Sequence, residues 1–303
     1  MKCQVKTDKN VSFGGNGMNN DKLVKKALRL QLIMKLASKL RPAKIGKERL
    51  IETKSGNVSV LEYGFDSTET EPLFIDMHGG GFVLGWAAMD EPMCVYIREK
   101  TGVKAISIDY PKAPKHPYPV AVEAIYEVVK HYIDNAVNYG INLDSVGVGG
   151  HSAGGNFATV MCIIAKEKGD FSFKYQVLDY PPCDMSLDAY ERPNPKGAIS
   201  PRMVDMFNAC YYGKDYEYAK TPYMSPVYAT EEQLTGLPPA LLILAGKDSL
   251  HDEGARYYEA LKAANVPVEF HEFENSVHGF TYKRTPDAKK GWEVMADFIH
   301  RNK

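Results

Sequence analysis

The chain has 303 residues, of which 44% are hydrophobic and 25% charged, so it can bury a large core and form one domain with an elaboration. Its formal net charge is -1 and its sequence pI about 6.7, so no overall basic field would attract nucleic acid or an anionic membrane. The five cysteines are scattered, odd in number and without CxxC spacing. This argues against a disulfide framework and against a zinc site, and favours a reducing, cytoplasmic location.

The N-terminal region begins with a polar stretch over residues 1–20, which predicts a loose tail rather than a secretory signal. From Asp21 to Leu40, apolar residues recur every three or four positions, as in an amphipathic helix, and Pro42 ends this pattern. We therefore predict a cap helix over 21–44, packed on the body with its lysine-rich face in solvent; binding to a membrane surface is the alternative. No apolar run is long enough for stable membrane insertion.

Two strand-like stretches follow at 48–53 and 58–63, joined by the sequence SGN, a turn typical of an antiparallel hairpin. Short apolar strands then alternate with helical periods, which predicts an α/β fold with a mostly parallel central sheet and helices on both faces. The predicted strands cover 73–77, 105–109, 146–149, 175–178, 240–245 and 268–273, and the predicted helices cover 119–137, 153–168, 252–264 and 286–301.

The strand pattern stops between Cys183 and Thr230, where Tyr, Pro and Met become frequent. An insertion at the carboxyl edge of a parallel sheet lies over the crevice where ligands bind. We therefore predict a cap insertion over 185–230, with the catalytic core formed by 45–184 and 231–303.

The most specific motif is the GHSAG sequence at residues 150–154, which lies between an apolar strand and a helical run. A nucleophile on a sharp strand-to-helix turn needs small neighbours, because the strained backbone leaves little room for side chains. A glycine-rich connection without chemistry is the alternative, but the context favours Ser152 as the nucleophile.

A second motif, HGGG at residues 78–81, also follows a strand. Acyl transfer passes through an oxyanion, and glycines allow backbone amides to turn toward it. The amides of Gly80, Gly81 and Ala153 are the predicted oxyanion hole, although a merely flexible loop is the alternative. Four residues after this loop are predicted to line the pocket with cap residues, plain packing being the alternative; they are Phe82, Val83, Leu84 and Trp86.

A serine hydroxyl needs a positioned base, and the base needs a carboxylate to fix its tautomer. His278 follows the last predicted strand by a short loop, and Asp248 directly follows the strand before it. Asp252 and Glu253 are alternatives for the carboxylate, but helix capping also explains them. The order Ser152, Asp248, His278 along the chain is that of the α/β-hydrolase fold.

The chain resembles the bacterial hormone-sensitive-lipase-like esterases, a family of carboxylesterases and acetyl esterases, from about residue 70 onward. The matching segments are 78–82, 109–119, 150–155, 222–226, 248–254 and 278–280. The resemblance implies the same triad and the same three amides, a cap of N-terminal helices plus the insertion, and a homodimer if an exposed final strand pairs two sheets. The sequence departs from the family at His151, where Asp is usual, and at Ser249, where Pro is common. Asp76 is also unusual for a buried parallel strand.

The expected activity is hydrolysis of short-chain acyl or acetyl esters through an acyl-enzyme on Ser152, without a metal or organic cofactor. The expected partner is a small ester rather than nucleic acid or membrane. A formamidase with the same triad, similar to kynurenine formamidases, and a non-catalytic small-molecule-binding module are the alternatives.

Overall fold

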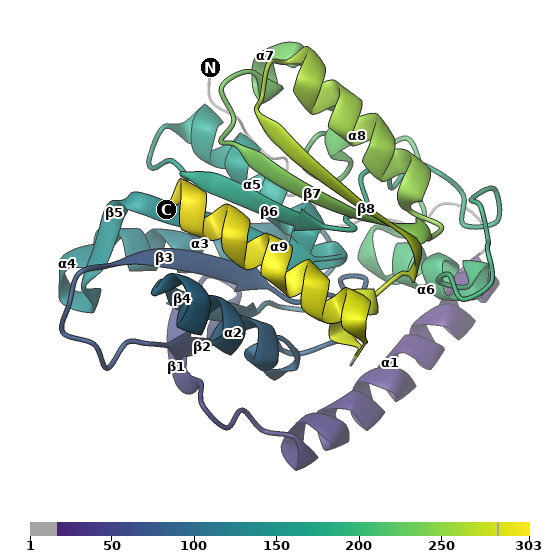
Figure 1. Cartoon of the computed structure of the whole chain (residues 1–303). Helices are drawn as coiled ribbons and strands as arrows, with labels where there is room; N and C mark the ends of the chain where they lie inside the picture. The colour runs from purple at the N-terminus through teal and green to yellow at the C-terminus, as the bar shows by residue number, and fades with distance from the viewer. Residues whose placement is uncertain (1–16, 284) are drawn as a thin grey trace.

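The computed structural model describes residues 17–283 and 285–303, and its core is one eight-stranded sheet (Figure 1). The strand order is β1-β2-β4-β3-β5-β6-β7-β8. β1 pairs antiparallel with β2, and β2 pairs antiparallel with β4, whereas the remaining neighbours are parallel. The prediction of an α/β fold with a mostly parallel sheet is confirmed.

The elements have the following bounds. The strands are β1 (Lys47–Thr53), β2 (Gly56–Tyr63), β3 (Glu71–Met77), β4 (Lys104–Asp109), β5 (Ile141–His151), β6 (Tyr175–Asp179), β7 (Ala240–Lys247) and β8 (Val268–Val277). The α-helices are α1 (Gly17–Leu40), α2 (Glu91–Thr101), α3 (Val120–Asp134), α4 (Ala136–Tyr139), α5 (Ala153–Lys168), α6 (Pro201–Tyr211), α7 (Glu231–Leu234), α8 (His251–Ala263) and α9 (Pro286–Asn302). Three short 3-10 helices are η1 (Ala87–Met89), η2 (Pro226–Tyr228) and η3 (Phe280–Tyr282).

Helices cover both faces of the sheet, and a separate apolar layer fills each face. On one face, α2 and α9 pack on the strands (Figure 1); on the other, α3, α5 and α8 do so. Side chains alternate along a strand, so neighbours such as Leu241 and Leu242 on β7 enter opposite layers. Because both layers are apolar, a central strand such as β7 reads as a nearly continuous apolar run.

Several predicted boundaries need correction. α1 starts at Gly17, so the predicted tail extends too far, and residues 1–16 lie outside the described residues. The helix ends at Leu40, four residues before the predicted boundary. β8 continues to Val277, where a loop was predicted, because its edge keeps pairing with β7 after a register shift. α2 lies outside the predicted elements; Pro92, in its first turn, is tolerated there although prolines usually mark helix ends.

The cap is built from α1 and α6, which pack on each other (Figure 1). The amide of Gln31 fastens α1 to the body by donating to the carbonyls of Val83 and Ala113, at 2.8 Å each. The second half of α1 packs less than its apolar stripe predicts, since Leu36 and Leu40 are 56% and 83% exposed. This leaves α1 held mainly by its first half and by Gln31.

Two features of the described chain relate to its composition. The four cysteines there are buried and unpaired, while Cys3 lies outside the described residues; they are Cys94, Cys162, Cys183 and Cys210. In the part of the chain that the structure describes, no helix combines the length and the apolar character needed to cross a membrane.

Candidate active site

Ser152 occupies the sharp turn between β5 and α5. Its backbone has φ 52° and ψ -117°, a region that is strained for any residue with a side chain. The Ser152 amide donates to the carbonyl of Asp179 at 2.8 Å, and its carbonyl accepts from the amide of Asn156 at 3.1 Å. These bonds hold the strained turn between β6 and the first turn of α5.

The small residues of the GHSAG motif are required because β3 lies directly against the turn. A Cβ atom added at Gly150 or at Gly154 would overlap the carbonyl oxygen of Met77, at the end of β3. Close packing between the turn and β3 therefore requires glycine at these two positions of the motif. The sequence predicts this need for small residues.

The structure brings the side chains of Ser152, His278 and Asp248 together, although they lie far apart in the sequence. The Ser152 hydroxyl donates to Nε2 of His278 at 2.8 Å, and Nδ1 of His278 donates to Oδ2 of Asp248 at 2.6 Å. Asp248 is 2% exposed, and its other carboxylate oxygen accepts from the amide of Leu250. The ring of Tyr180 meets that of His278 edge-on at 4.8 Å and limits its rotation. A serine, an imidazole and a buried carboxylate thus form one hydrogen-bonded chain.

The two alternative carboxylates lie elsewhere. The Asp252 side chain is 72% exposed. Glu253 is buried, but it pairs with Arg192 and accepts from the amide of Cys183, which ties the start of the cap insertion to α8.

The glycine loop lies beside Ser152 with free amides. Gly80 and Gly81 have φ values of 136° and 60°, and the Gly80 carbonyl accepts from the amide of Leu84 at 2.8 Å. Within the described residues, the amides of Gly80, Gly81 and Ala153 donate no hydrogen bond. A Cβ atom at Gly81 would overlap the ring of Phe207 from the cap, so the loop and α6 are in close contact.

His78 and two tyrosines hold the glycine loop. The Tyr110 hydroxyl donates to the carbonyl of His78 at 2.8 Å, and their rings stack at 4.3 Å. The Gly79 amide donates to the hydroxyl of Tyr282 at 2.8 Å. Burial lowers the pKa of His78, which keeps its ring neutral and suited to packing.

A cavity of about 270 Å³ opens onto Ser152, His278 and the glycine loop. Its walls are largely apolar and include Met34 of α1, Leu84, Ile199, and Met203 and Phe207 of α6. The sequence predicts that the cap contributes to the pocket but identified none of these residues. The i, i+4 spacing of Met203 and Phe207, which places both on one face of a helix, is a signal by which they could have been found.

Of the four predicted pocket residues, only Leu84 lines this cavity. Phe82 is a correction: it is buried and stacks on Tyr211 at a centroid distance of 4.0 Å, because a φ of 65° turns it into the core. Val83 is also buried, and together with Trp86 it lines a neighbouring cavity beneath α1 instead.

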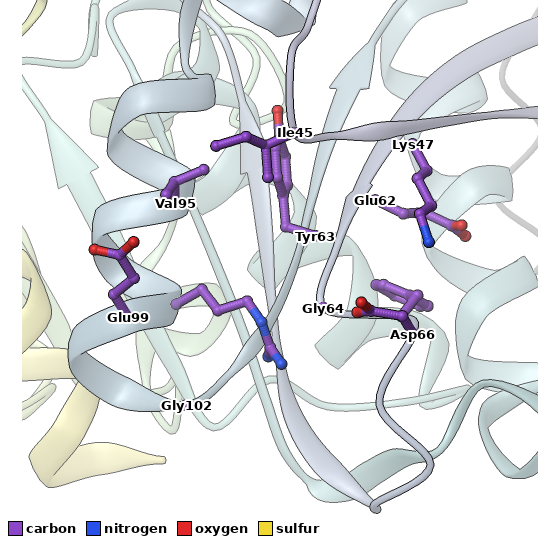
Figure 2. A pocket seen from close by; sticks show the side chains of 11 residues that line it. Ile45, Lys47, Glu62, Tyr63, Gly64, Asp66, Val95, Glu99 and Gly102 are labelled. Atoms are coloured by element: carbon purple, nitrogen blue, oxygen red, sulfur yellow. The ribbon is translucent and has the colours of Figure 1, made fainter.

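A larger cavity, about 470 Å³, lies elsewhere, between β2 and α2 (Figure 2). Its rim is charged, and its principal groups are already paired: Glu62 with Arg49, and Arg98 with Glu71. It contains none of the predicted site residues, so size alone does not identify the site.

His151 precedes the serine but does not line the cavity at Ser152. Its Nδ1 donates to Oδ2 of Asp179 at 2.5 Å. Burial lowers the pKa of His151, but the carboxylates of Asp90, Asp179 and Asp76 outweigh that effect and raise it to about 9. The structure thus places a second histidine–carboxylate pair behind the nucleophile turn.

Comparisons with known proteins identify the family of this chain. A model of the alpha/beta hydrolase fold family matches residues 74–282. Esterase LipI of Mycobacterium tuberculosis is 34% identical over 212 residues, which cover 69% of this chain and 65% of that protein. The chain spans 61% to 68% of the length of the first curated relatives it matches.

Among solved structures, a hyperthermophilic esterase from Pyrobaculum calidifontis superposes with a TM-score of 0.79 at 29% identity, covering 95% of this chain and 94% of that one. A thermostable esterase from Pseudomonas putida gives 0.81 at 26% identity, covering 91% and 90%. The chain belongs to the alpha/beta hydrolase fold family, in its hormone-sensitive-lipase-like branch.

Proposed function

We propose that the protein is a serine carboxylesterase that hydrolyses short-chain acyl or acetyl esters. The observation that carries this proposal is the continuous hydrogen-bonded chain from Ser152 through His278 to Asp248, which opens into an apolar cavity. The named esterases among its relatives and structural neighbours support the reaction class.

In the first half of the reaction, the Ser152 oxygen attacks the ester carbonyl while Nε2 of His278 takes its proton. Asp248 holds the imidazole in the tautomer that accepts this proton and stabilises the imidazolium that forms. The free amides of Gly80, Gly81 and Ala153 stabilise the oxyanion. The imidazolium then returns the proton to the leaving alcohol.

In the second half, a water molecule attacks the acyl group bound to Ser152. His278 takes a proton from the water and returns it to the serine oxygen as the acid leaves. The same amides stabilise the second oxyanion, so one site serves both steps.

The cavity favours small acyl groups. Its volume of about 270 Å³ lies below the range of about 300–1,000 Å³ typical of drug-sized ligands. Met203 and Phe207 of the cap line the same cavity as the catalytic side chains and limit the space for a long chain. We therefore expect acetate and butyrate esters to be hydrolysed faster than decanoate.

The direct test is a panel of p-nitrophenyl esters from acetate to decanoate, measured for the full chain and for Ser152→Ala. A profile that declines with chain length and disappears in the variant supports the proposal, whereas a rate unaffected by the substitution contradicts it. An N-formyl amide measured in parallel distinguishes an esterase from a formamidase. Failure of a fluorophosphonate probe to label Ser152 in the folded protein would instead favour a binding module.

A further inference from the structure

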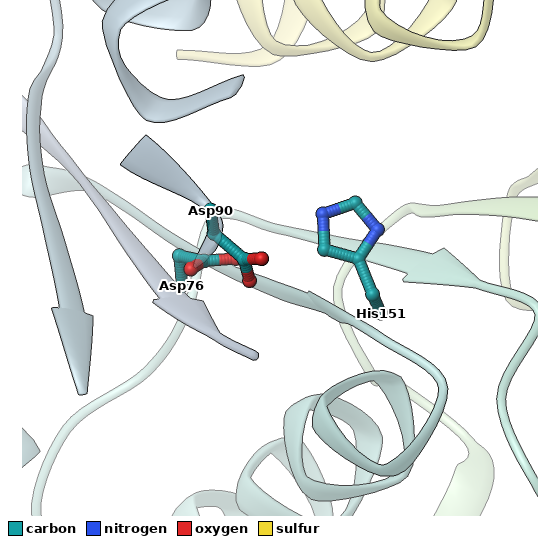
Figure 3. A group of neighbouring side chains, drawn as sticks. All are labelled: Asp76, Asp90 and His151. Atoms are coloured by element: carbon teal, nitrogen blue, oxygen red, sulfur yellow. The ribbon is translucent and has the colours of Figure 1, made fainter. Parts of the chain in front are cut away.

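Three buried side chains lie close together (Figure 3), and none of them lines the cavity at Ser152. Asp76 lies on β3, Asp90 precedes α2, and His151 is the last residue of β5. Their exposed fractions are 0%, 1% and 2%. One donor atom from each lies within 4.8 Å of the other two. Three distant segments of the chain therefore direct oxygen and nitrogen donors at one point.

Three of the four carboxylate oxygens in this group lack a hydrogen-bond partner among the described residues. Ser107 donates to Oδ2 of Asp76 at 2.8 Å, but among the described residues Oδ1 of Asp76 and both oxygens of Asp90 have no hydrogen-bond partner. Polar neighbours of Asp90 include Asp76 and Tyr282. Two buried carboxylates side by side are unfavourable unless a positive charge lies between them, and either a protonated His151 or a bound metal ion would supply that charge.

His151 is oriented as a metal-binding histidine would be. Its Nδ1 donates to Asp179, whose Oδ2 also accepts from the Thr281 hydroxyl at 2.7 Å. The nitrogen left for the two carboxylates is Nε2, and it lies on their side of the ring in Figure 3. Histidines that bind metals ordinarily donate their other N–H to a carboxylate or carbonyl in this way, which fixes the tautomer.

A small cavity of about 150 Å³ reaches the group from outside. Asp90 and His151 form part of its wall, together with Pro92 and Trp292. Met89 and Tyr282 line both this cavity and the one at Ser152, so they stand between the two sites. The cavity supplies a path for an ion and room for water in the coordination positions that the protein leaves open.

We propose that Asp76, Asp90 and His151 bind a divalent metal ion of the zinc type, with one imidazole nitrogen, two carboxylate oxygens and water as ligands. Nitrogen and oxygen donors at about 2.0–2.2 Å are usual for zinc, and three protein ligands plus water is a common set. When the ion binds, Nε2 of His151 gives up its proton to solvent, and the two carboxylates and the neutral imidazole then balance the charge of the ion. Cysteine spacing gives no sign of this site because none of these three ligands is a cysteine.

The ion would act on the fold rather than on the substrate. It would join β3, the start of α2 and the end of β5, and the end of β5 is where the strained Ser152 turn begins. Asp179 is a positioning residue in this arrangement, since it orients His151 without contacting the ion.

The first experiment is a calorimetric titration of the chelator-treated full chain with Zn²⁺. We expect one ion per chain, with a dissociation constant tighter than about 10 µM, and weaker binding of Mg²⁺ and Ca²⁺, which prefer oxygen ligands. Anomalous scattering at the zinc edge should place the ion among the three side chains. Absence of binding, or a scattering peak elsewhere, would overturn the proposal.

Variants separate this site from adventitious surface binding. Asp179→Asn should weaken Zn²⁺ binding about 10- to 100-fold, and Asp90→Asn, which removes a ligand, should weaken it more. Asp252→Asn is the matched control. This substitution also neutralises a carboxylate beside a histidine, because Asp252 contacts Nδ1 of His251. Nε2 of His251 contacts Glu272 rather than the three proposed ligands, so Asp252→Asn should leave the affinity for Zn²⁺ unchanged. Wild-type affinity in Asp90→Asn would exclude the site.

Two further measurements keep the outcome clear. If Asp90→Asn does not fold, the scattering experiment on the unaltered chain still decides the question. Ser152→Ala should bind Zn²⁺ with unchanged affinity, so loss of ester hydrolysis and loss of metal binding can be distinguished.

Discussion

Two histidine–carboxylate pairs lie on either side of the nucleophile turn, His278 with Asp248 and His151 with Asp179. In both, Nδ1 donates to a buried aspartate, at 2.6 Å and 2.5 Å. They differ at the other nitrogen, which meets the Ser152 hydroxyl in the first pair and two buried carboxylates in the second. In both pairs, the aspartate therefore fixes only the tautomer and the orientation of the imidazole. The group at Nε2 decides whether the imidazole serves as a base or holds a charge in the core.

The largest effect should come from breaking the pair at the ester cavity. His278→Ala removes the base, so we expect kcat on p-nitrophenyl acetate to fall about 10⁶-fold. Combining it with Ser152→Ala should cause little further loss, because the two side chains act as one unit. His251→Ala removes a histidine that contacts Glu272 away from the cavity at Ser152; it is the control and should retain full activity. Substantial activity in His278→Ala would mean that another group is the base.

The two aspartates provide the sharpest form of the comparison. Asp248→Asn should lower kcat about 10⁴-fold, because the imidazole loses its orientation and its tautomer. Asp179→Asn should lower the free energy of unfolding by about 2 kcal/mol, through loss of a charge-assisted hydrogen bond, with a much smaller fall in kcat. Steady-state rates and urea unfolding of both variants give the measurement. Equal effects of the two substitutions on kcat would remove the distinction between the pairs.

The glycine loop is expected to stabilise the oxyanion at the site of Ser152 and His278, and Gly81→Ala tests this. The added methyl group meets the ring of Phe207 and moves the amide, so kcat should fall about 10²- to 10³-fold. Gly169→Ala is a matched control, since Gly169 has a similar φ of 67° with open space around it. If both variants lose the same activity, backbone strain rather than loss of the oxyanion hole is responsible.

The smallest effect is expected from the cap wall of the same cavity. Phe207→Ala enlarges the space opposite Ser152, so kcat/KM for hexanoate relative to acetate should rise about tenfold. Tyr190→Ala, at an exposed position in the cap insertion, should leave that ratio unchanged. An unaltered ratio in Phe207→Ala would show that the acyl chain lies elsewhere.

Much of the framework could be predicted from local pattern. The apolar strands and the helices α3, α5, α8 and α9 were recognisable because period and burial agree within each segment. The boundary of β8 and the presence of α2 were not, because the first depends on pairing with β7 and the second on packing of Met93 and Ile97 beneath the sheet.

The same division holds at the site. Ser152 and the glycine loop are marked in the sequence because strained backbone requires small residues beside it. Asp248 and His278 could be placed by their positions after β7 and after β8, since carboxyl ends of parallel strands share one edge. Phe82 was misplaced because a positive φ, invisible in composition, turns it into the core.

The chemical groups present, and the sheet edge at which they gather, follow from the sequence alone, because motif spacing and the succession of strands along the chain are local properties. Only the tertiary structure decided which imidazole faces a hydroxyl and which faces carboxylates. That depends on contacts between β3, β5, β6 and α2 that are distant along the chain. Asp76, unusual as a strand residue, has its counterparts in Asp90 and His151, and no stretch of sequence contains all three.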